Sequence, residues 1–174
     1  MFTVSDAVAR IIKDIEPLGV ERVQILEALG RVLATPIVSP LTLPAWDNSA
    51  MDGYALRASD VEGATADNPI SLTVLETVAA GAFPSHAVTR GACTRIMTGA
   101  PLPEGVDTVI RLEDTDGGTE RVSIRSDRDA GRNVRHRGED ITTGTLVLDH
   151  GQPLGAAQIG VLASVGASSV DVYR

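Results

Sequence analysis

A short polar stretch, residues 47–52, gathers side chains that could hold a cation. It places Asp47, Asn48, Ser49 and Asp52 close together, directly before a predicted strand. Such side chains commonly hydrogen-bond the local backbone and build tight turns. Carboxylates are also the ligands that Mg²⁺ prefers, and this ion usually keeps several waters. Composition alone favours the turn and leaves the cation site open.

A second stretch, residues 95–105, predicts a strand that runs into a rigid loop. Pro101 and Pro103 restrict the backbone there, while Gly99 permits a close approach of the backbone to another group. Thr98 would lie at the end of the strand, where its hydroxyl and its N–H can meet a ligand. The alternative is a stiff crossover loop that binds nothing.

The third stretch, residues 133–140, sets Arg135 and Arg137 beside Glu139 and Asp140. Arginine presents a planar fork that suits phosphates and other oxyanions. The segment could clamp an anion next to a metal-binding carboxylate. It could equally be a surface cluster in which the arginines pair with the neighbouring acids.

The larger segment around this stretch is basic within an acidic chain. Residues 121–137 carry six arginines against two aspartates, whereas the 174 residues together have a net charge of −8. Ordinary surface ion pairs are the commoner explanation of such a segment. The overall charge and the small number of aromatic residues argue against a nucleic-acid partner.

Composition and motifs exclude several further classes of function. Cys93 is the only cysteine, so an internal disulfide and a cysteine-rich zinc site are excluded. The chain has no Walker A loop, no dinucleotide-binding fingerprint and no G-x-S-x-G motif. It shows neither a secretory signal nor an apolar run near the roughly 20 residues of a membrane span. We therefore expect a cytoplasmic protein with no membrane partner.

The elements that must position the three stretches are mostly strands. Asp116-Gly117-Gly118 predicts a hairpin turn between the strands on either side of it. The chain lacks a regular alternation of strands and helices, which argues against a doubly wound parallel sheet. Apolar alternation bounded by Gly, Asp and Asn predicts strands at 53–57, 70–78, 94–98, 108–112, 121–124 and 145–148.

Helices are predicted near both ends of the chain. The N-terminal one begins at Thr3 or Ser5 as its N-cap and ends before Pro17. A short strand around Val23 is followed by a short helix over 26–33, which Gly30 weakens. One face of the first helix is apolar, with the spacing expected for this structure: Val4, Val8, Ile11, Ile12 and Ile15.

The C-terminal region predicts one more helix and one more strand. The helix covers 156–164 and ends at Gly166, and the strand covers 169–173. The whole pattern indicates an α+β fold that is rich in strands, with helices mainly near the two ends.

Five segments together resemble the MoeA/gephyrin family of molybdenum insertases. They occur in the order and spacing of that family, and the resemblance covers essentially the whole chain. The family usually has phenylalanine where this chain has Trp46. The segments are EALGRVLA (27–34), DNSAMDGYA (47–55), RIMTGAPLP (95–103), NVRHRGED (133–140) and IGVLASVG (159–166).

The resemblance implies a role in molybdenum cofactor biosynthesis. Family members take adenylated molybdopterin and molybdate, release AMP and leave molybdenum on the dithiolene, with the help of a divalent cation such as Mg²⁺. By motif match, Asp52, Thr98 and Asp140 look like catalytic residues, and Asp52 and Asp140 also like metal ligands. The residues expected to bind substrate are Ser49, Arg135 and Arg137.

The resemblance also implies an architecture. An elongated dimerising domain would be formed by 1–43 and 141–174, and an inserted β-rich domain, 44–140, would carry half of the active site. Family members are homodimers that continue beyond the position of Arg174, and their site is composite. This part alone is therefore expected to be inactive. The alternative is a free-standing, non-catalytic module for dimerisation or anion binding.

Overall fold

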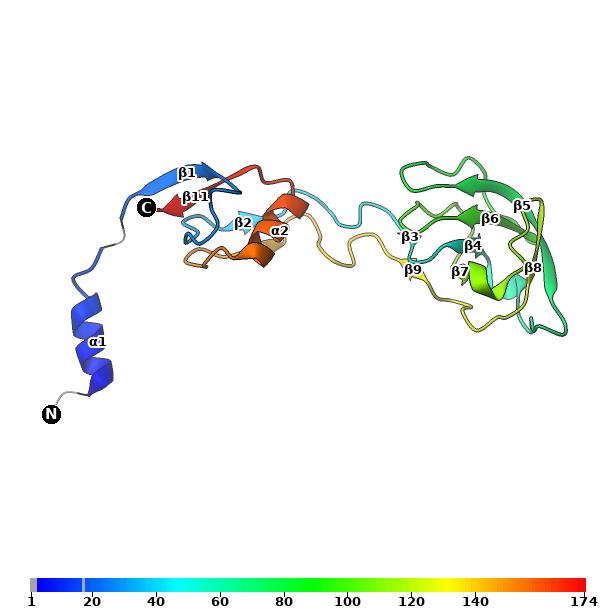
Figure 1. Cartoon of the computed structure of the whole chain (residues 1–174), viewed down its shortest axis with the longest axis horizontal. Helices are drawn as coiled ribbons and strands as arrows, with labels where there is room; N and C mark the ends of the chain where they lie inside the picture. The colour runs from blue at the N-terminus through cyan, green and yellow to red at the C-terminus, as the bar shows by residue number, and fades with distance from the viewer. Residues whose placement is uncertain (1–2, 17) are drawn as a thin grey trace. The chain divides into compact units, whose positions relative to one another are not determined.

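A computed structural model describes residues 3–16 and 18–174 of the chain (Figure 1). The chain divides into two compact units. Unit 1 contains residues 1–41 and 143–174, and unit 2 contains residues 42–142. Unit 2 is therefore inserted into unit 1 in the sequence.

Unit 2 is built on one mixed sheet of five strands. β5 and β6 run parallel, and every other neighbouring pair is antiparallel. The strands lie in the order β7 (Thr108–Arg111), β4 (Gly53–Leu56), β6 (Ala92–Ile96), β5 (Ile70–Val78) and β8 (Arg121–Ile124). β5 and β8 have the bounds that the sequence predicts, and the other strands of the sheet differ from their predictions by one or two residues.

The chain reverses at residues 116–118 as predicted, but the turn does not join two neighbouring strands, because β7 and β8 form opposite edges of the sheet. After β7 the chain passes through a 3₁₀ turn, η2 (Leu112–Asp114), and Thr115 then bridges Ile124 of β8. This bridge joins the segment that follows β7 to the edge strand β8. Asp116 closes the turn, because its Oδ1 accepts hydrogen bonds from the backbone N–H groups of residues 118 and 123.

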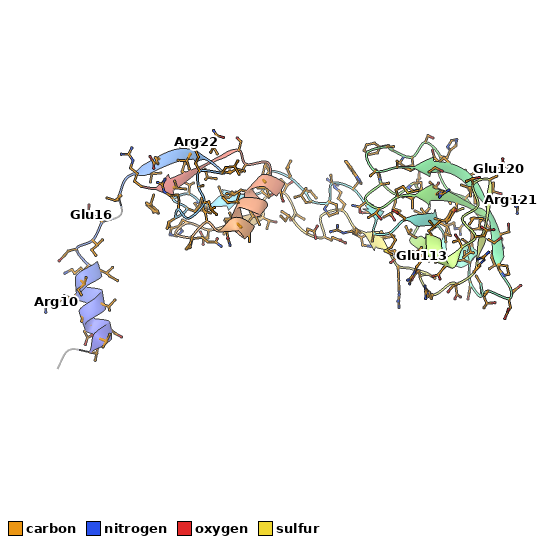
Figure 2. The ribbon with its side chains drawn as sticks, viewed as in Figure 1. Arg10, Glu16, Arg22, Glu113, Glu120 and Arg121 are labelled. Atoms are coloured by element: carbon orange, nitrogen blue, oxygen red, sulfur yellow. The ribbon has the colours of Figure 1, made fainter. Side chains whose placement is uncertain are left out.

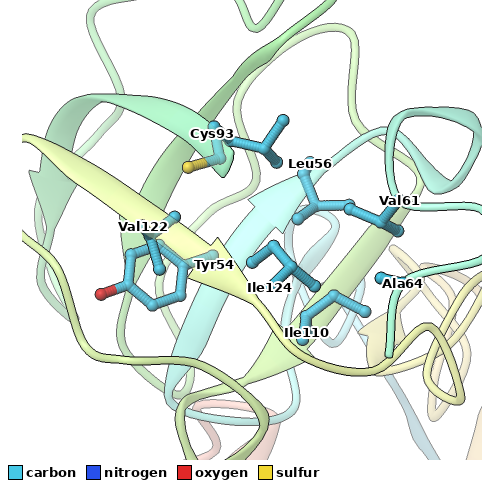
Figure 3. Close-up of a cluster of buried hydrophobic side chains, with 9 residues drawn as sticks. Tyr54, Leu56, Val61, Ala64, Cys93, Ile110, Val122 and Ile124 are labelled. Carbon is cyan, nitrogen blue, oxygen red and sulfur yellow. The ribbon is translucent and has the colours of Figure 1, made fainter. Parts of the chain in front are cut away.

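The curved sheet of unit 2 encloses a core of buried hydrophobic side chains (Figure 3). Tyr54 is fully buried, and its hydroxyl donates to the carbonyl of Gly118 at 2.8 Å. Cys93 lies in the same core, where burial raises the pKa of its thiol to about 12. A thiol with that pKa is inert as a nucleophile at neutral pH. The core cluster consists of Tyr54, Leu56, Val61, Ala64, Leu72, Cys93, Ile110, Val122 and Ile124.

Strand direction gathers three loops at one end of this sheet. Ile96, at the end of β6, lies opposite both Val78, at the end of β5, and Gly53, at the start of β4. The segment before β4 and the loops after β5 and β6 therefore leave from the same end. We call residues 44–52, 79–86 and 97–102 the loop end of unit 2.

Two shorter elements complete unit 2. The two-residue strands β3 (Asn48–Ser49) and β9 (Val134–Arg135) pair in antiparallel fashion, and η1 (Ala58–Asp60) follows β4. Charged side chains cover the outside of the unit, as Glu120 and Arg121 show in Figure 2.

Unit 1 packs one helix and two strand pairs around a second core. β1 (Val20–Gln24) pairs with β11 (Ser169–Tyr173), and β2 (Ile37–Val38) pairs with β10 (Leu146–Leu148). Helix α2 (Ala156–Ser164) buries Leu162 and is followed by Gly166 at φ 79°. The buried cluster of this unit is Ala28, Leu33, Leu148, Leu154, Leu162, Val170 and Val172.

Helix α1 (Val4–Ile12) begins with a capping box, in which Thr3 and Asp6 exchange hydrogen bonds. None of the residues in this helix is buried, and its apolar face is exposed. Pro17, the predicted end of the helix, lies outside the described residues. No helix in the described part of the chain is long and apolar enough to cross a membrane.

The predicted helix over 26–33 is wrong, because residues 25–30 form turns. Gly30 adopts φ 79°, a left-handed conformation that a helix interior does not use, and its N–H donates to the carbonyl of Leu154. Leu33 then bridges Val172 and is fully buried. Tertiary pairing thus overrides the weak helical spacing of the leucines.

Candidate functional site

The three polar stretches meet within unit 2. The N–H of Ser49 donates to the carbonyl of Ala100 at 3.0 Å, and the N–H of Gly99 donates to the carbonyl of Ser49 at 2.8 Å. On the other side, Ser49 pairs with Val134 across the β3–β9 ladder. Residues 47–52 therefore lie between the 97–102 loop and residues 133–140, and backbone hydrogen bonds fix their positions.

Asp52 and Thr98 form the most sharply defined polar pair. Oδ1 of Asp52 accepts the N–H of Thr98 at 2.7 Å and its hydroxyl at 2.8 Å. Both bonds hold the pKa of Asp52 below its usual value, and the bond from the backbone N–H of Thr98 contributes most. An exposed carboxylate that stays ionised at neutral pH is suited to bind a cation and unsuited to donate a proton. The bonds engage Oδ1 and leave Oδ2 as the oxygen that can approach a cation.

Two local features place this pair at the end of the sheet. The carbonyl of Asp52 accepts the N–H of Leu112 at 2.9 Å, which fixes the backbone beside β7. Gly99 adopts φ 81°, a conformation that side chains other than glycine rarely take, so the chain turns directly after Thr98. The loop geometry therefore depends on a glycine next to the threonine.

Arg135 is paired with acids of its own segment. Its Nε donates to Glu139 and a terminal nitrogen donates to Asp140, both at 2.8 Å. The second carboxylate oxygen of Glu139 accepts the N–H of His136. The sequence left open an anion clamp or a cluster of arginines paired with neighbouring acids. In the structure, Arg135 is paired with its neighbouring acids. An incoming anion would have to displace two carboxylates from this guanidinium.

Arg137 differs from Arg135 because no described acid forms an ion pair with its side chain. Its backbone N–H donates to Oδ1 of Asp47 at 2.7 Å, and this bond is the main reason that the pKa of Asp47 is lowered. Asp47 thus ties residues 133–140 to residues 47–52. This role is not evident from the sequence, since an aspartate in a turn-like segment carries no distinctive signal.

Ser49, one of the residues expected to bind substrate, is held in a local turn. Its side chain is fully buried, and its hydroxyl bonds both the carbonyl and the N–H of Met51. Both hydrogen bonds of this hydroxyl are therefore made within the turn itself. Ser49 shapes the backbone that leads to Asp52, as the turn interpretation of this stretch implied.

The two acids expected to bind metal belong to separate hydrogen-bonded pairs. Asp52 is bonded by Thr98, and Asp140 by Arg135. Within residues 3–16 and 18–174, no group of three or more His, Cys, Asp or Glu residues is arranged to hold a metal ion. A Mg²⁺ ion at Asp52 would fit only with one protein carboxylate and with water or phosphate oxygens as its other ligands, which is a common arrangement for this ion.

A pair of exposed aromatic rings also lies at the loop end. Trp46 and Phe83 meet edge to face, with their ring centroids 5.0 Å apart. Trp46 directly precedes Asp47, and Phe83 comes from the loop after β5. In the sequence, Trp46 stands out only as a replacement for phenylalanine, and nothing there connects it with Phe83. No local pattern predicts that contact.

The geometry of these stretches can be compared with known proteins. Residues 2–166 match the model of the MoeA N-terminal region (domain I and II). The chain belongs to the MoeA family. Over 165 residues it is 42% identical to molybdopterin molybdenumtransferase 2 of Mycobacterium tuberculosis, covering 95% of this chain and 40% of that protein.

Other relatives give the same result. A molybdopterin molybdenumtransferase of Synechococcus elongatus is 39% identical, over 90% of this chain and 39% of that protein. The crystal structure of the MoeA protein from Pyrococcus horikoshii superimposes with a TM-score of 0.88 at 35% identity, over 97% of this chain and 45% of that one. The present chain thus spans about two-fifths of the length of these MoeA relatives.

Proposed function

We propose that this chain acts in molybdenum cofactor biosynthesis. It would be the N-terminal part of the enzyme that inserts molybdenum from molybdate into adenylated molybdopterin and releases AMP. The names of the relatives support the reaction class. The observation that supports a chemical role for this part is the exposed, ionised Asp52, whose geometry is fixed by two hydrogen bonds from Thr98.

The reaction places demands that these residues can meet. Cleavage of a phosphoanhydride requires that negative charge on the phosphates be neutralised, by a metal or by a guanidinium. We propose that Asp52 holds Mg²⁺, which supplies charge neutralisation, and that Thr98 keeps this carboxylate ionised and oriented. Arg137, which has no ion-pair partner among the described acids, would bind an oxyanion of the substrate. Asp140 would act through Arg135, whose direction it fixes.

We further propose that the site is composite and that the protein is a homodimer. Unit 2 would supply one half of each site, and a further domain would supply the other half. One feature supports a partner surface on unit 1: helix α1 buries none of its residues, so the apolar side chains along it are exposed. The isolated 174-residue chain is then expected not to convert adenylated molybdopterin.

The test is reconstitution of AMP release. The 174-residue chain is incubated with adenylated molybdopterin, molybdate and Mg²⁺, with and without a chain that carries the remaining part of a relative. We expect AMP only in the mixture, and a loss of about a hundredfold or more for Asp52→Asn and Thr98→Val. Arg121→Ala, an exposed change on β8, is the matched control.

Two outcomes would contradict the proposal. Full turnover by the isolated chain would exclude a composite site. Unchanged AMP release by Asp52→Asn, with dimerisation retained, would favour the alternative of a non-catalytic module for dimerisation or anion binding.

A further inference from the structure

The contact between Trp46 and Phe83 is unusual because both rings are exposed. The Trp46 residue is 41% exposed and Phe83 is 65% exposed, and their ring planes are inclined at 67°. Tyr54, by contrast, is fully buried in the core of the same unit. Exposed aromatic surface that is held in a fixed geometry commonly marks a place where another molecule binds.

The loop that presents Phe83 is held in shape by Glu76 on β5. One carboxylate oxygen of Glu76 accepts the N–H groups of Ser85 and His86, each at 2.9 Å, and the other accepts the hydroxyl of Ser85 at 2.7 Å. Although burial opposes ionisation, these bonds leave the pKa of Glu76 lowered. The ring of Phe83 is therefore supported by a structured loop, which reduces the entropy lost when a ligand binds.

The segment that presents Trp46 lies alongside a guanidinium-bearing segment. The N–H of Gly138 donates to the carbonyl of Pro44 at 3.0 Å, and the N–H of Arg137 donates to the carboxylate of Asp47. These two bonds bracket Trp46 and fix the backbone of Arg137 next to it. The aromatic rings of the loop end thus lie beside a segment whose Arg137 forms an ion pair with no described acid.

We propose that Trp46 and Phe83 form a stacking platform for the planar nitrogen heterocycle of a phosphate-bearing ligand, with Arg137 binding the phosphate. Stacking would use the exposed rings, and the guanidinium of Arg137, which forms no ion pair with a described acid, would bind the negative phosphate. This inference rests on the proposed function and deepens it. The proposed substrate carries two planar ring systems, a pterin and an adenine, joined by phosphates.

The single tryptophan gives a direct measurement on the 174-residue chain, because Trp46 is itself part of the platform. Its fluorescence is titrated with AMP, with a pterin monophosphate and with ribose 5-phosphate. We expect saturable quenching by a ring-bearing phosphate and none by ribose 5-phosphate, which has no aromatic ring. The ring compound with the lower dissociation constant identifies which ring the platform binds.

Variants separate the two parts of the site. Phe83→Ala is expected to weaken binding of the preferred ring compound about tenfold, and Phe83→Tyr to retain it. Arg137→Ala is expected to weaken binding of AMP or pterin monophosphate, and to leave binding of the phosphate-free nucleoside or pterin unchanged. Leu75→Ala removes another exposed apolar side chain of unit 2 and is the control.

Three outcomes would overturn the inference. They are a lack of saturable quenching by both ring compounds, an affinity unchanged in Phe83→Ala, and a concentration-dependent shift of Trp46 emission without ligand, which would mean that a second copy covers the rings. The two proposals fail separately. AMP release that requires Asp52, without ring binding at Trp46, refutes only the platform. Ring binding without reconstituted AMP release refutes the proposed reaction and leaves the platform standing.

Discussion

The two units differ in how completely they bury their own apolar surface. Of the large apolar side chains exposed among the described residues, unit 2 contributes only Trp46, Leu75 and Phe83. Unit 1, the smaller unit, contributes all the others. They are Val4, Val8, Ile11, Ile12, Ile15, Leu18, Val20, Leu26, Leu29, Val32, Val38, Leu41 and Leu146.

This difference separates two ways of using hydrophobic residues. In unit 2 the curved sheet brings its edges together, so its strands bury their inner side chains against one another. In unit 1 the short strand pairs and α2 bury one cluster, and helix α1 has no buried residue at all. Exposed apolar surface beyond scattered single residues is characteristic of protein interfaces. Unit 2 thus has the features of a scaffold for a site, and unit 1 those of an interface.

The largest expected effect comes from the close packing of strands in unit 2. A side chain at Gly53 would collide with the backbone carbonyl of Ile110 in the neighbouring strand β7. Gly53→Ala should therefore lower the free energy of unfolding by about 3 kcal/mol or more, measured by urea denaturation. Gly19→Ala, where nothing lies within 4 Å of the added carbon, is the matched control in unit 1. Equal urea midpoints for the two variants would refute this account of the sheet.

The next prediction tests whether unit 1 supplies the interface. Ile11, 68% exposed on α1, would be buried in the proposed homodimer. Ile11→Glu should raise the dimer dissociation constant at least about thirtyfold, since a charge would enter an apolar contact. Sedimentation velocity measures the change. Leu75→Glu, on the surface of unit 2, should leave the dimer intact. If both variants weakened the dimer equally, the contrast between the units would not describe the interface.

Acid should act on an ion pair of unit 2 whose carboxylate is buried. Arg111 forms a forked pair with Asp129 at 2.9 and 3.2 Å, and these bonds lower the pKa of the almost fully buried Asp129. A carboxyl whose pKa is lowered by folding stabilises the protein above its unfolded pKa of about 3.9, and this contribution is lost as the pH falls through the folded pKa.

The measurement for this pair is thermal unfolding as a function of pH. At pH 7, Asp129→Asn should lower the melting temperature by roughly 5 °C relative to the parent chain. Below the folded pKa the difference should shrink, because the parent has then lost the same ionic contribution. A difference that stayed constant between neutral and acidic pH would show that the charge of Asp129 does not stabilise unit 2.

The smallest effect is expected at an open position of unit 1. Gly160 lies on the exposed side of α2, and an added carbon would meet nothing within 4 Å. Gly160→Ala should stabilise the protein by about 1 kcal/mol, because alanine favours the helix more than glycine does. Urea denaturation of a monomeric background such as Ile11→Glu isolates this effect. If Gly160→Ala instead destabilised this monomeric variant, the side of α2 that carries Gly160 would have to pack against other residues of the same chain.

Local pattern was sufficient for most elements and failed where distant residues decided the outcome. Alternating apolar residues correctly predicted the strands at 70–78 and 121–124, because each strand has one buried face. The turn at 116–118 was also a real chain reversal, but the strand paired with β8 was not the expected one. Which strands become neighbours depends on the whole sheet, and no short window of sequence contains that information.

The sequence by itself determined the family, the strand-rich character of the chain and the polar residue types gathered in three stretches. Only the tertiary structure decided how those residues are used. Asp52 accepts its two hydrogen bonds from a residue 46 positions away, Arg135 is neutralised by its own segment, and Trp46 meets a ring from another loop. The physical reason is that hydrogen bonds, ion pairs and ring contacts act over a few ångströms in space. Strand register brings such partners together independently of their separation along the chain.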